Sequence, residues 1–160
     1  MEDRLFRDAM GKFATGVTVV TTKLEDGSHG MTANAFMSVS LDPKLVVISI
    51  GHKARFLSKV RESKKFAVNI LSAEQKEMSM VFAGQLKDEL EINFEELAGL
   101  PVLPGALAQV SCEVVSEYVE GDHTLFIGKV LDIKLNDGEP LIFFAGKYRE
   151  LVELEPLKTI

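Results

Sequence analysis

The first residues of the chain carry apolar side chains at the spacing of an α-helix. These side chains recur every three or four positions and would share one side of the helix. They are Leu5, Phe6, Ala9, Met10 and Phe13. Acidic Glu2 and Asp3 would lie in the first turn, where negative charge suits the helix dipole. The pattern predicts an amphipathic helix over residues 2–14.

The residues that follow are typical of β-strands. β-Branched side chains dominate residues 17–22 and favour a strand. Asp26 and Gly27 form a pair typical of a hairpin turn, which predicts a second strand over residues 30–35. Residues 45–50 are almost all apolar, so we expect a strand there that is buried on both faces.

The middle of the chain mixes short helical and strand patterns. Residues 54–62 predict a short helix, and residues 66–71 predict another strand. Apolar residues recur at helical intervals over residues 73–83, whereas residues 84–105 contain several glycines and prolines without a lasting period. We therefore expect a helix followed by an irregular segment.

Two long strand patterns come next. Apolar and polar residues alternate over residues 108–114, which predicts one buried and one solvent-exposed face and places Cys112 inside. A second long strand is expected over residues 123–135. After a turn, residues 141–144 predict a last strand, and a short C-terminal helix is expected after it.

Six or more strands joined mostly by hairpins, with helices at the beginning, middle and end, predict an antiparallel barrel with peripheral helices. We expect a single domain over residues 1–160. Alternating βαβ units and a G-x-G-x-x-G turn are absent, so a Rossmann-type site is not expected. Residues 11–18 have the glycine spacing of a phosphate-binding loop, but Val17 stands where that loop needs lysine.

Composition narrows the choice of partners and compartment. The chain has 18 basic and 24 acidic residues and a net charge of −6, which disfavours nucleic acid and anionic membranes as partners. The N-terminal region lacks the apolar run of a signal peptide, and no stretch approaches the length of a membrane span. The single cysteine, Cys112, cannot form an internal disulfide, so we expect a reducing, cytoplasmic setting.

Metal and acyl-transfer chemistry have no support in the sequence. His29, His52 and His123 lack the spacing of metal ligands, so no metal site is expected. No G-x-S-x-G elbow occurs, and Cys112 is better explained as a small buried hydrophobe than as a nucleophile.

Residues 30–40 mix small side chains with hydroxyl and amide groups where a strand should be apolar. Small side chains let a flat ligand approach the backbone, and polar groups could hydrogen-bond the edge of a heteroaromatic ring. The polar members are Thr32, Asn34, Ser38 and Ser40. The alternative is a polar strand that runs into a surface loop.

Residues 49–56 join the end of an apolar strand to the start of a short helix. Free N–H groups at a helix start, together with Lys53 and Arg55, suit a phosphate or pyrophosphate. A solvated basic turn is the alternative. His123, in residues 121–124, lies at the entry to a strand, where a structural role and a functional role both remain open.

These motifs, in this order, resemble the short-chain flavin reductase family, which has an FMN-binding split-barrel fold. The matching segments are residues 6–22, 30–36, 38–40 with Pro43, 66–71, 121–126 and 146–148. The likeness is greatest to the reductase components of two-component hydroxylases that act on phenol or 4-hydroxyphenylacetate. The resemblance implies a mainly β fold, an antiparallel Greek-key split β-barrel with peripheral helices.

The resemblance also implies roles for individual residues. The flavin ring and ribityl chain would be lined by Thr32, Ala33, Asn34, Ala35, Phe36, Ser38 and Val39, with Ser49 and Ile50 from the next strand. The phosphate would be held by Lys53, Ala54, Arg55 and Phe56. The nicotinamide side would be formed by His29, Gly30, His123, Gly146 and Tyr148. The adenine of an FAD would be touched by Phe82 and Gln85.

The implied protein is a homodimeric NAD(P)H:flavin oxidoreductase. Hydride would pass from NADH, or NADPH, to FAD or FMN when the two rings stack, and no general base would be required. His123 would position the nicotinamide, with proton donation as the alternative role. The reduced flavin would go to a separate aromatic-ring monooxygenase.

Two other functions stay open at this point. One is a non-catalytic flavin- or haem-binding protein on the same barrel. The other is an oxidase of the pyridoxamine-phosphate type, although the basic cluster expected for a second phosphate is missing.

Overall fold

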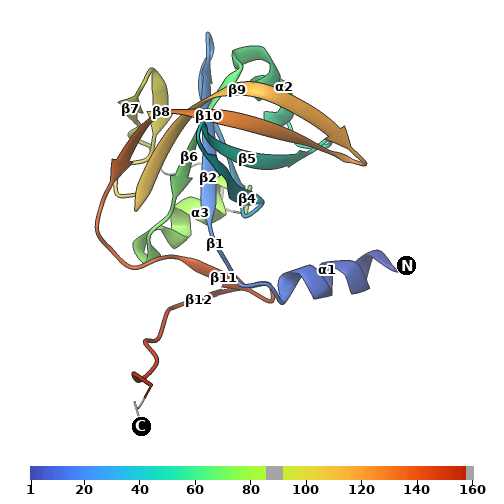
Figure 1. Ribbon diagram of the computed structural model, residues 1–160, viewed down its shortest axis with the longest axis vertical. Helices are drawn as coiled ribbons and strands as arrows, with labels where there is room; N and C mark the ends of the chain where they lie inside the picture. The colour runs from blue at the N-terminus through green and yellow to red at the C-terminus, as the bar shows by residue number, and fades with distance from the viewer. Residues whose placement is uncertain (86–91, 158–160) are drawn as a thin grey trace.

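The computed structural model describes residues 1–85 and 92–157, and its main element is a seven-stranded antiparallel sheet (Figure 1). In spatial order the strands are β3 (Gly27–Ala33), β2 (Thr18–Leu24), β6 (Lys65–Ile70), β9 (Ala108–Glu120), β10 (His123–Leu135), β5 (Lys44–Gly51) and β4 (Phe36–Leu41). The predicted antiparallel β-fold is confirmed.

The two edge strands of this sheet, β3 and β4, are consecutive in the chain. Only Asn34 and Ala35 lie between them, and a linker this short spans roughly 10 Å at most. A flat sheet of this width would hold its edges roughly 30 Å apart, because neighbouring strands are spaced by about 4.8 Å. The sheet must therefore curl until β3 and β4 come close where the linker joins them. We call this meeting of the two edge strands the seam, and the polar stretch 30–40 belongs to it.

The main core lies inside the curled sheet and under α2 (Phe56–Ser63). α2 buries one apolar side against the barrel, and these side chains join fully buried residues of β5, β6 and β10. The central members are Phe56, Leu57, Val60, Ile48, Ile50, Phe66 and Phe126. Cys112 is fully buried among them, as predicted.

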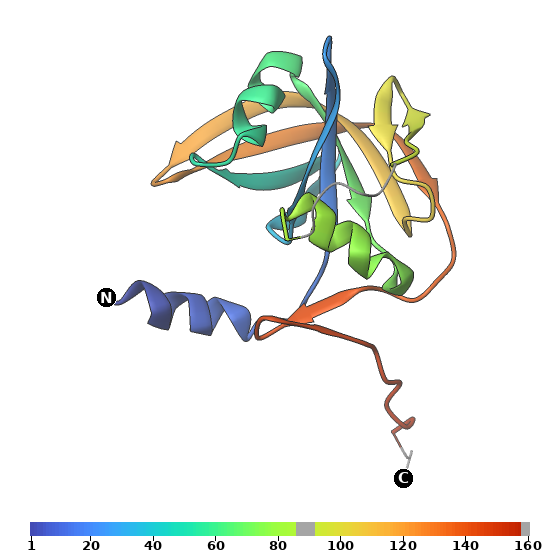
Figure 2. The same ribbon diagram turned by 180° about the vertical axis from the view of Figure 1, so that it is seen from behind.

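A second, smaller core lies below the barrel. There η1 (Ala73–Gln75) and α3 (Lys76–Phe82) lie beside a three-stranded sheet of β1 (Thr15–Gly16), β11 (Ile142–Phe144) and β12 (Lys147–Arg149) (Figures 1 and 2). Its buried residues are Val17, Val19, Leu71, Leu103 and Leu141. This arrangement places α3 and β12 next to the seam strand β3.

The predicted N-terminal helix forms as α1 (Asp3–Gly11) and projects from the lower sheet (Figures 1 and 2). None of its residues is buried, although the helix is amphipathic. Its apolar side therefore lacks cover within the described part of the chain. Among the described residues no helix is long and apolar enough to cross a membrane.

The outer face of β9 is a correction to the sequence-based prediction. The polar side chains of Gln109 and Ser111 were expected in solvent, but both are fully buried. Ser111 donates a hydrogen bond to the carbonyl of Leu97 at 2.8 Å, and Gln109 donates to the carbonyl of Leu103 at 2.6 Å. A hairpin of β7 (Glu95–Leu97) and β8 (Leu100–Val102) covers this face.

The same hairpin corrects the expectation of an irregular segment at 84–105, of which residues 86–91 lie outside the described residues.

Three other expectations also differ from the structure. β5 is buried on one face only, because the residues that alternate with Val46, Ile48 and Ile50 are half-exposed. The strand expected at 30–35 ends at Ala33. In place of the expected C-terminal helix the chain forms β12, and residues 150–157 have neither helix nor strand.

Candidate functional site

A cavity of about 250 Å³ lies where the seam strand β3 meets α3 and the β11–β12 hairpin. It brings together residues assigned separately to flavin and to nicotinamide. Its lining is Val17, Thr32, Ala33, Asn34, Ser79, Ala83, Gln85, Phe143, Gly146 and Tyr148. Among the described strands β3 pairs on one side only, so alternate backbone N–H groups along it point away from the sheet.

One wall of this cavity is a chain of hydroxyl contacts. Thr32 Oγ1 donates a hydrogen bond to the carbonyl of Ser79 at 2.6 Å, and Ser79 Oγ lies 2.8 Å from the phenol oxygen of Tyr148. The Tyr148 ring meets Phe143 edge-on, with centroids 5.4 Å apart, and Lys76 Nζ lies 5.5 Å from the Tyr148 ring centroid. This wall therefore combines the hydroxyl groups of Thr32, Ser79 and Tyr148 with the aromatic rings of Phe143 and Tyr148.

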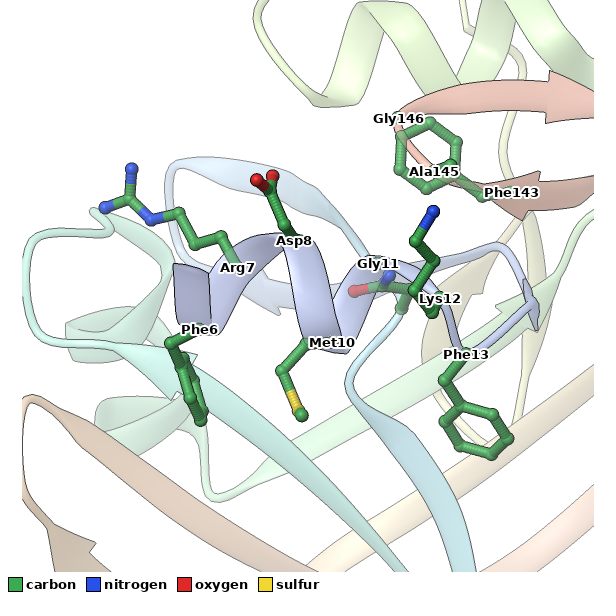
Figure 3. A pocket seen from close by; sticks show the side chains of 11 residues that line it. Phe6, Arg7, Asp8, Met10, Gly11, Lys12, Phe13, Phe143, Ala145 and Gly146 are labelled. Atoms are coloured by element: carbon green, nitrogen blue, oxygen red, sulfur yellow. The ribbon is translucent and has the colours of Figure 1, made fainter. Parts of the chain in front are cut away.

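A second cavity of about 600 Å³ adjoins the first, between α1 and the turn after β11 (Figure 3). The two cavities share Asn34, Phe143 and Gly146 in their linings, so they lie side by side, and together they are called the cleft. Figure 3 shows the amine of Lys12 pointing toward the turn at Ala145 and Gly146. The carbonyl of Gly11 accepts a hydrogen bond from the Ala145 N–H at 2.9 Å, which fixes this turn to the end of α1.

The proposed phosphate turn lies between β5 and α2, after the end of β5 that pairs with the start of β4. Lys53 and Arg55 are exposed, and Arg55 is the last residue before α2, so both cations belong to the turn that leads into the helix. The side chains of Ile50 and Phe56 are buried in the core. These two residues could therefore meet a ligand through their backbone only.

His123 lies directly beside this turn. Its β10 position is opposite Gly51 of β5, and a Cβ atom on Gly51 would lie 3.6 Å from His123 Nε2. The His52 N–H donates to the carbonyl of Asp122 at 2.9 Å. His123 Nδ1 lies 2.8 Å from the Asp122 carboxylate, and this hydrogen bond lowers the pKa of Asp122. The fold thus joins two turns that are 70 residues apart in the chain.

Beneath these two turns lies a buried polar contact that the sequence did not reveal. The Thr124 side chain is fully buried, and its Oγ1 lies 3.0 Å from His52 Nε2. Arg61 of α2 donates to the same oxygen at 3.3 Å and also to Glu117 at 3.3 Å. Thr124 therefore fixes the two turns to α2. Within the described part of the chain no three His, Cys, Asp or Glu side chains cluster as metal ligands.

Residues 10–152 match the family described as "Flavin reductase like domain".

The chain belongs to this flavin reductase family.

Its relatives include the NADH-dependent flavin reductase of a Rhodococcus species, 45% identical over 148 residues that cover 91% of this chain and 84% of the relative. Another is the 4-hydroxyphenylacetate 3-monooxygenase reductase component of Thermus thermophilus, 36% identical over 92% of this chain and 95% of that protein. The family predicted from the motifs is confirmed.

Solved flavin reductase structures agree with the fold. The flavin reductase PheA2 in its native state superposes with a TM-score of 0.94, at 65% identity over 96% of this chain and 100% of that chain. The styrene monooxygenase flavin reductase of Pseudomonas putida superposes with a TM-score of 0.86, at 39% identity over 95% and 99% of the two chains. The predicted split-barrel fold is therefore confirmed.

Several residues of the reductase that were assigned to flavin have a structural role as well. Ala33, Phe36 and Ala54 pack against the main core. The Ser49 N–H donates to the carbonyl of Ala35 at 3.1 Å, which ties the seam linker to β5. Ser38 and Val39 lie at a β-bulge, where β4 has one more residue than the facing stretch of β5.

On the nicotinamide side, the structure brings Gly146 and Tyr148 to the cleft but places His29 and His123 outside the lining of both cavities. His29 lies in the β2–β3 hairpin, where its Nε2 is 2.7 Å from Asp26 Oδ1. Gly30 is covered by the ring of Phe82, which would lie 2.6 Å from a Cβ atom at this position. The structure therefore offers a packing reason for the glycine.

Sequence reasoning missed several site residues, among them Ser79 and Thr124. Ser79 lines the cavity from α3, and Thr124 is buried below the turns. A serine in a helix and a threonine in a strand carry no local signal of function. Their polar partners, Tyr148 and His52, lie 69 and 72 residues away along the chain.

Proposed function

We propose that this protein oxidises NADH, or NADPH, and reduces FAD or FMN in the cleft along the β3–β4 seam. The observation that carries the proposal is the cavity that joins Thr32, Ala33, Asn34 and Gln85 to Tyr148. Relatives named as NADH-dependent flavin reductases support the same activity. The solved structure of a Streptomyces globisporus NADH:FAD oxidoreductase in complex with NAD and FAD fragments, 36% identical to this chain, supports the same pair of ligands.

The described residues fit a flavin. The larger of the two adjoining cavities, about 600 Å³, falls in the size range of small-molecule sites, and the smaller, about 250 Å³, extends it. Small side chains at Ala33 and Ala35 keep the seam flat, and the outward N–H groups of β3 suit the carbonyl and nitrogen edge of the ring. Bound flavin supplies the hydride acceptor, and the nicotinamide supplies the hydride.

The chain's own residues bind and orient the two partners. Lys53 and Arg55 attract the phosphate, the amide of Asn34 offers hydrogen bonds to the ring edge, and Gln85 remains assigned to the adenine of an FAD. Tyr148 restricts the nicotinamide from the opposite side of the cleft. The assignment of His123 to the nicotinamide comes from the family resemblance, because His123 lies outside the lining of both cavities. Holding two rings at near-attack distance accounts for much of the rate of such a transfer, so no general base is needed.

NADH oxidation tests this function. Absorbance at 340 nm should fall when FAD or FMN is added to NADH and the protein. The rate of this fall should saturate as the flavin concentration rises. Asn34→Ala should raise the flavin concentration needed, whereas Asp137→Ala, an exposed change that lines neither cavity, should not. If neither NADH nor NADPH is consumed at any flavin concentration, a non-catalytic flavin- or haem-binding protein takes the place of the reductase.

We also propose a homodimer. A chain of 160 residues folded as one flavin reductase-like domain has little surface with which to enclose a dinucleotide and a stacked flavin. Phe6 and Met10 on α1 are 56% exposed, and Phe13, two residues past the end of α1, is 80% exposed. Figure 3 shows these three side chains on one side of the helix and Lys12 on the other. An apolar side of this kind is typical of an interface.

Sedimentation velocity at micromolar concentration should show a particle of twice 17.6 kDa. Phe13→Ser should weaken the dimer, and Lys12→Ser on the opposite side of the helix should not. A fully active monomer would contradict the proposal.

The reduced flavin goes to a separate monooxygenase component, as the names of the relatives indicate. We propose that this component hydroxylates an aromatic ring of the phenol or 4-hydroxyphenylacetate type, in the cytoplasm, where NADH is available. Hydroxylation of either compound should appear only when such a component is added. Product formation by this protein alone would overturn the partnership.

A further inference from the structure

The hydroxyl group of Ser79 lies at the junction of three elements of the cleft. The residue is fully buried in the middle of α3 and lines the smaller cavity. Its Oγ contacts the phenol oxygen of Tyr148 on β12 at 2.8 Å. A serine hydroxyl is costly to bury without a partner, so this contact accounts for its position.

The backbone of the same residue holds the opposite wall. The carbonyl of Ser79 accepts the helical hydrogen bond from the Ala83 N–H at 3.1 Å and a second one from Thr32 Oγ1 at 2.6 Å. Side chain and backbone of one residue therefore reach two strands. β3 carries Thr32, which is assigned to flavin, and β12 carries Tyr148, which is assigned to nicotinamide.

Tyr148 has little else to fix its hydroxyl group. β12 is three residues long and pairs with β11 alone among the described strands. The ring itself packs against the second core, Phe143 and Lys76, and none of these contacts involves the phenol oxygen. Among the described residues, the contact with Ser79 Oγ is the hydrogen bond that fixes the phenol oxygen.

We propose that Ser79 is a positioning residue for hydride transfer, which holds Tyr148 at the nicotinamide side of the cleft. The inference rests on the proposed assignment of Tyr148 to that side. Ser79→Ala removes the hydroxyl and keeps the carbonyl that accepts from Thr32, so the flavin side stays in place. The two ligands should therefore respond differently to this one change.

A double-mutant cycle tests the inference, with Ser79→Ala, Tyr148→Phe and the double variant. Each single change should lower kcat/KM for NADH about three- to tenfold, the size expected for one hydrogen bond. The double variant should lose no more than the larger single loss, because the two hydroxyls act through one contact. Flavin affinity, measured by fluorescence quenching, should change less than twofold.

Two further variants separate positioning from structure. Ser79→Thr keeps a hydroxyl and should restore most of the NADH kinetics. Ser116→Ala, a half-buried serine of β9 that lines neither cavity, should match the wild type. Urea unfolding of each variant shows whether a kinetic loss follows from lost stability.

The outcomes are distinct. Losses that multiply in the double variant, equal losses for flavin and NADH, or unchanged kinetics would each overturn the role of Ser79 while the reductase activity stands. A wild-type protein that consumes no NADH with flavin would instead overturn the proposed function and the inference with it.

Discussion

Replacing Gly30 with alanine puts a methyl group where the ring of Phe82 now lies. An ideal Cβ atom at this position would be 2.6 Å from Cε1 and 2.8 Å from Cδ1 of Phe82, and 3.4 Å from Cγ2 of Thr21. Carbon atoms in contact prefer about 3.5–4.0 Å. The ring must therefore move by roughly 1 Å, while β3 is held by its pairing with β2.

The cost of this change is almost entirely steric. Gly30 does not have a positive φ angle, so alanine can adopt its backbone conformation and stabilises by about 0.4–1 kcal/mol through the unfolded chain. Overpacking of this kind destabilises by about 1–3 kcal/mol. Phe82 lies at the end of α3 and can shift toward Phe94, with its centroid now 6.3 Å away. We expect a net loss of about 1–2 kcal/mol in the free energy of unfolding.

Urea unfolding measures this loss. Gly16→Ala is the matched control, because no atom lies within 4 Å of its ideal Cβ and its φ angle is also ordinary. The control should be neutral or slightly stabilising. Combining Gly30→Ala with Phe82→Leu should give a smaller total loss than the two single losses together, because leucine leaves room for the methyl group.

Two results would refute the steric argument. One is a Gly30→Ala protein as stable as the control, and the other is a double variant whose losses simply add. A rise in KM for NADH without any loss of stability would return Gly30 to the nicotinamide role that the family resemblance implies.

Three further predictions concern buried and paired groups. His123→Ala should lower kcat/KM for NADH by about 5- to 150-fold with much less effect on flavin affinity, and an equal loss in both would place His123 in the flavin site or the fold. Thr124→Val leaves His52 and Arg61 without their shared oxygen and should cost about 1–2 kcal/mol in urea unfolding, whereas Thr124→Ser should cost less. Burial raises the pKa of the Cys112 thiol from 9.0 to about 12, so the native protein at pH 8 should not react with an aromatic disulfide reagent until urea unfolds it. In the unfolded chain this thiol ionises at a lower pH than in the folded protein. The free energy of unfolding should therefore fall as the pH rises above 9.0.

Local patterns in the sequence determined much of the secondary structure. The strand predicted over 123–135 is β10, with the same limits, and the turn at Asp26 joins β2 to β3 as expected. Such elements follow from β-branched residues, alternation and turn residues, which act within a few positions. The combination of motifs along 6–148 also identified the family, although each motif alone is weak.

Local patterns failed where burial depends on a distant segment. Gln109 and Ser111 have the alternation of a solvent-exposed face, yet the β7–β8 hairpin covers them. The apolar side of α1 has the pattern of a buried face, yet nothing in the described chain covers it. Alternation shows that a strand has two different faces, but it does not show what packs on each.

The site itself was decided partly by sequence and partly by tertiary structure. The small and polar residues of the seam, such as Thr32 and Asn34, are visible as a departure from the apolar pattern of a strand. The contact of Ser79 with Tyr148 is not, because 69 residues separate the two hydroxyls and neither is unusual in its own segment. A hydrogen bond between distant residues exists only after the sheet has curled and α3 has packed beneath it, so its position is a property of the packed chain.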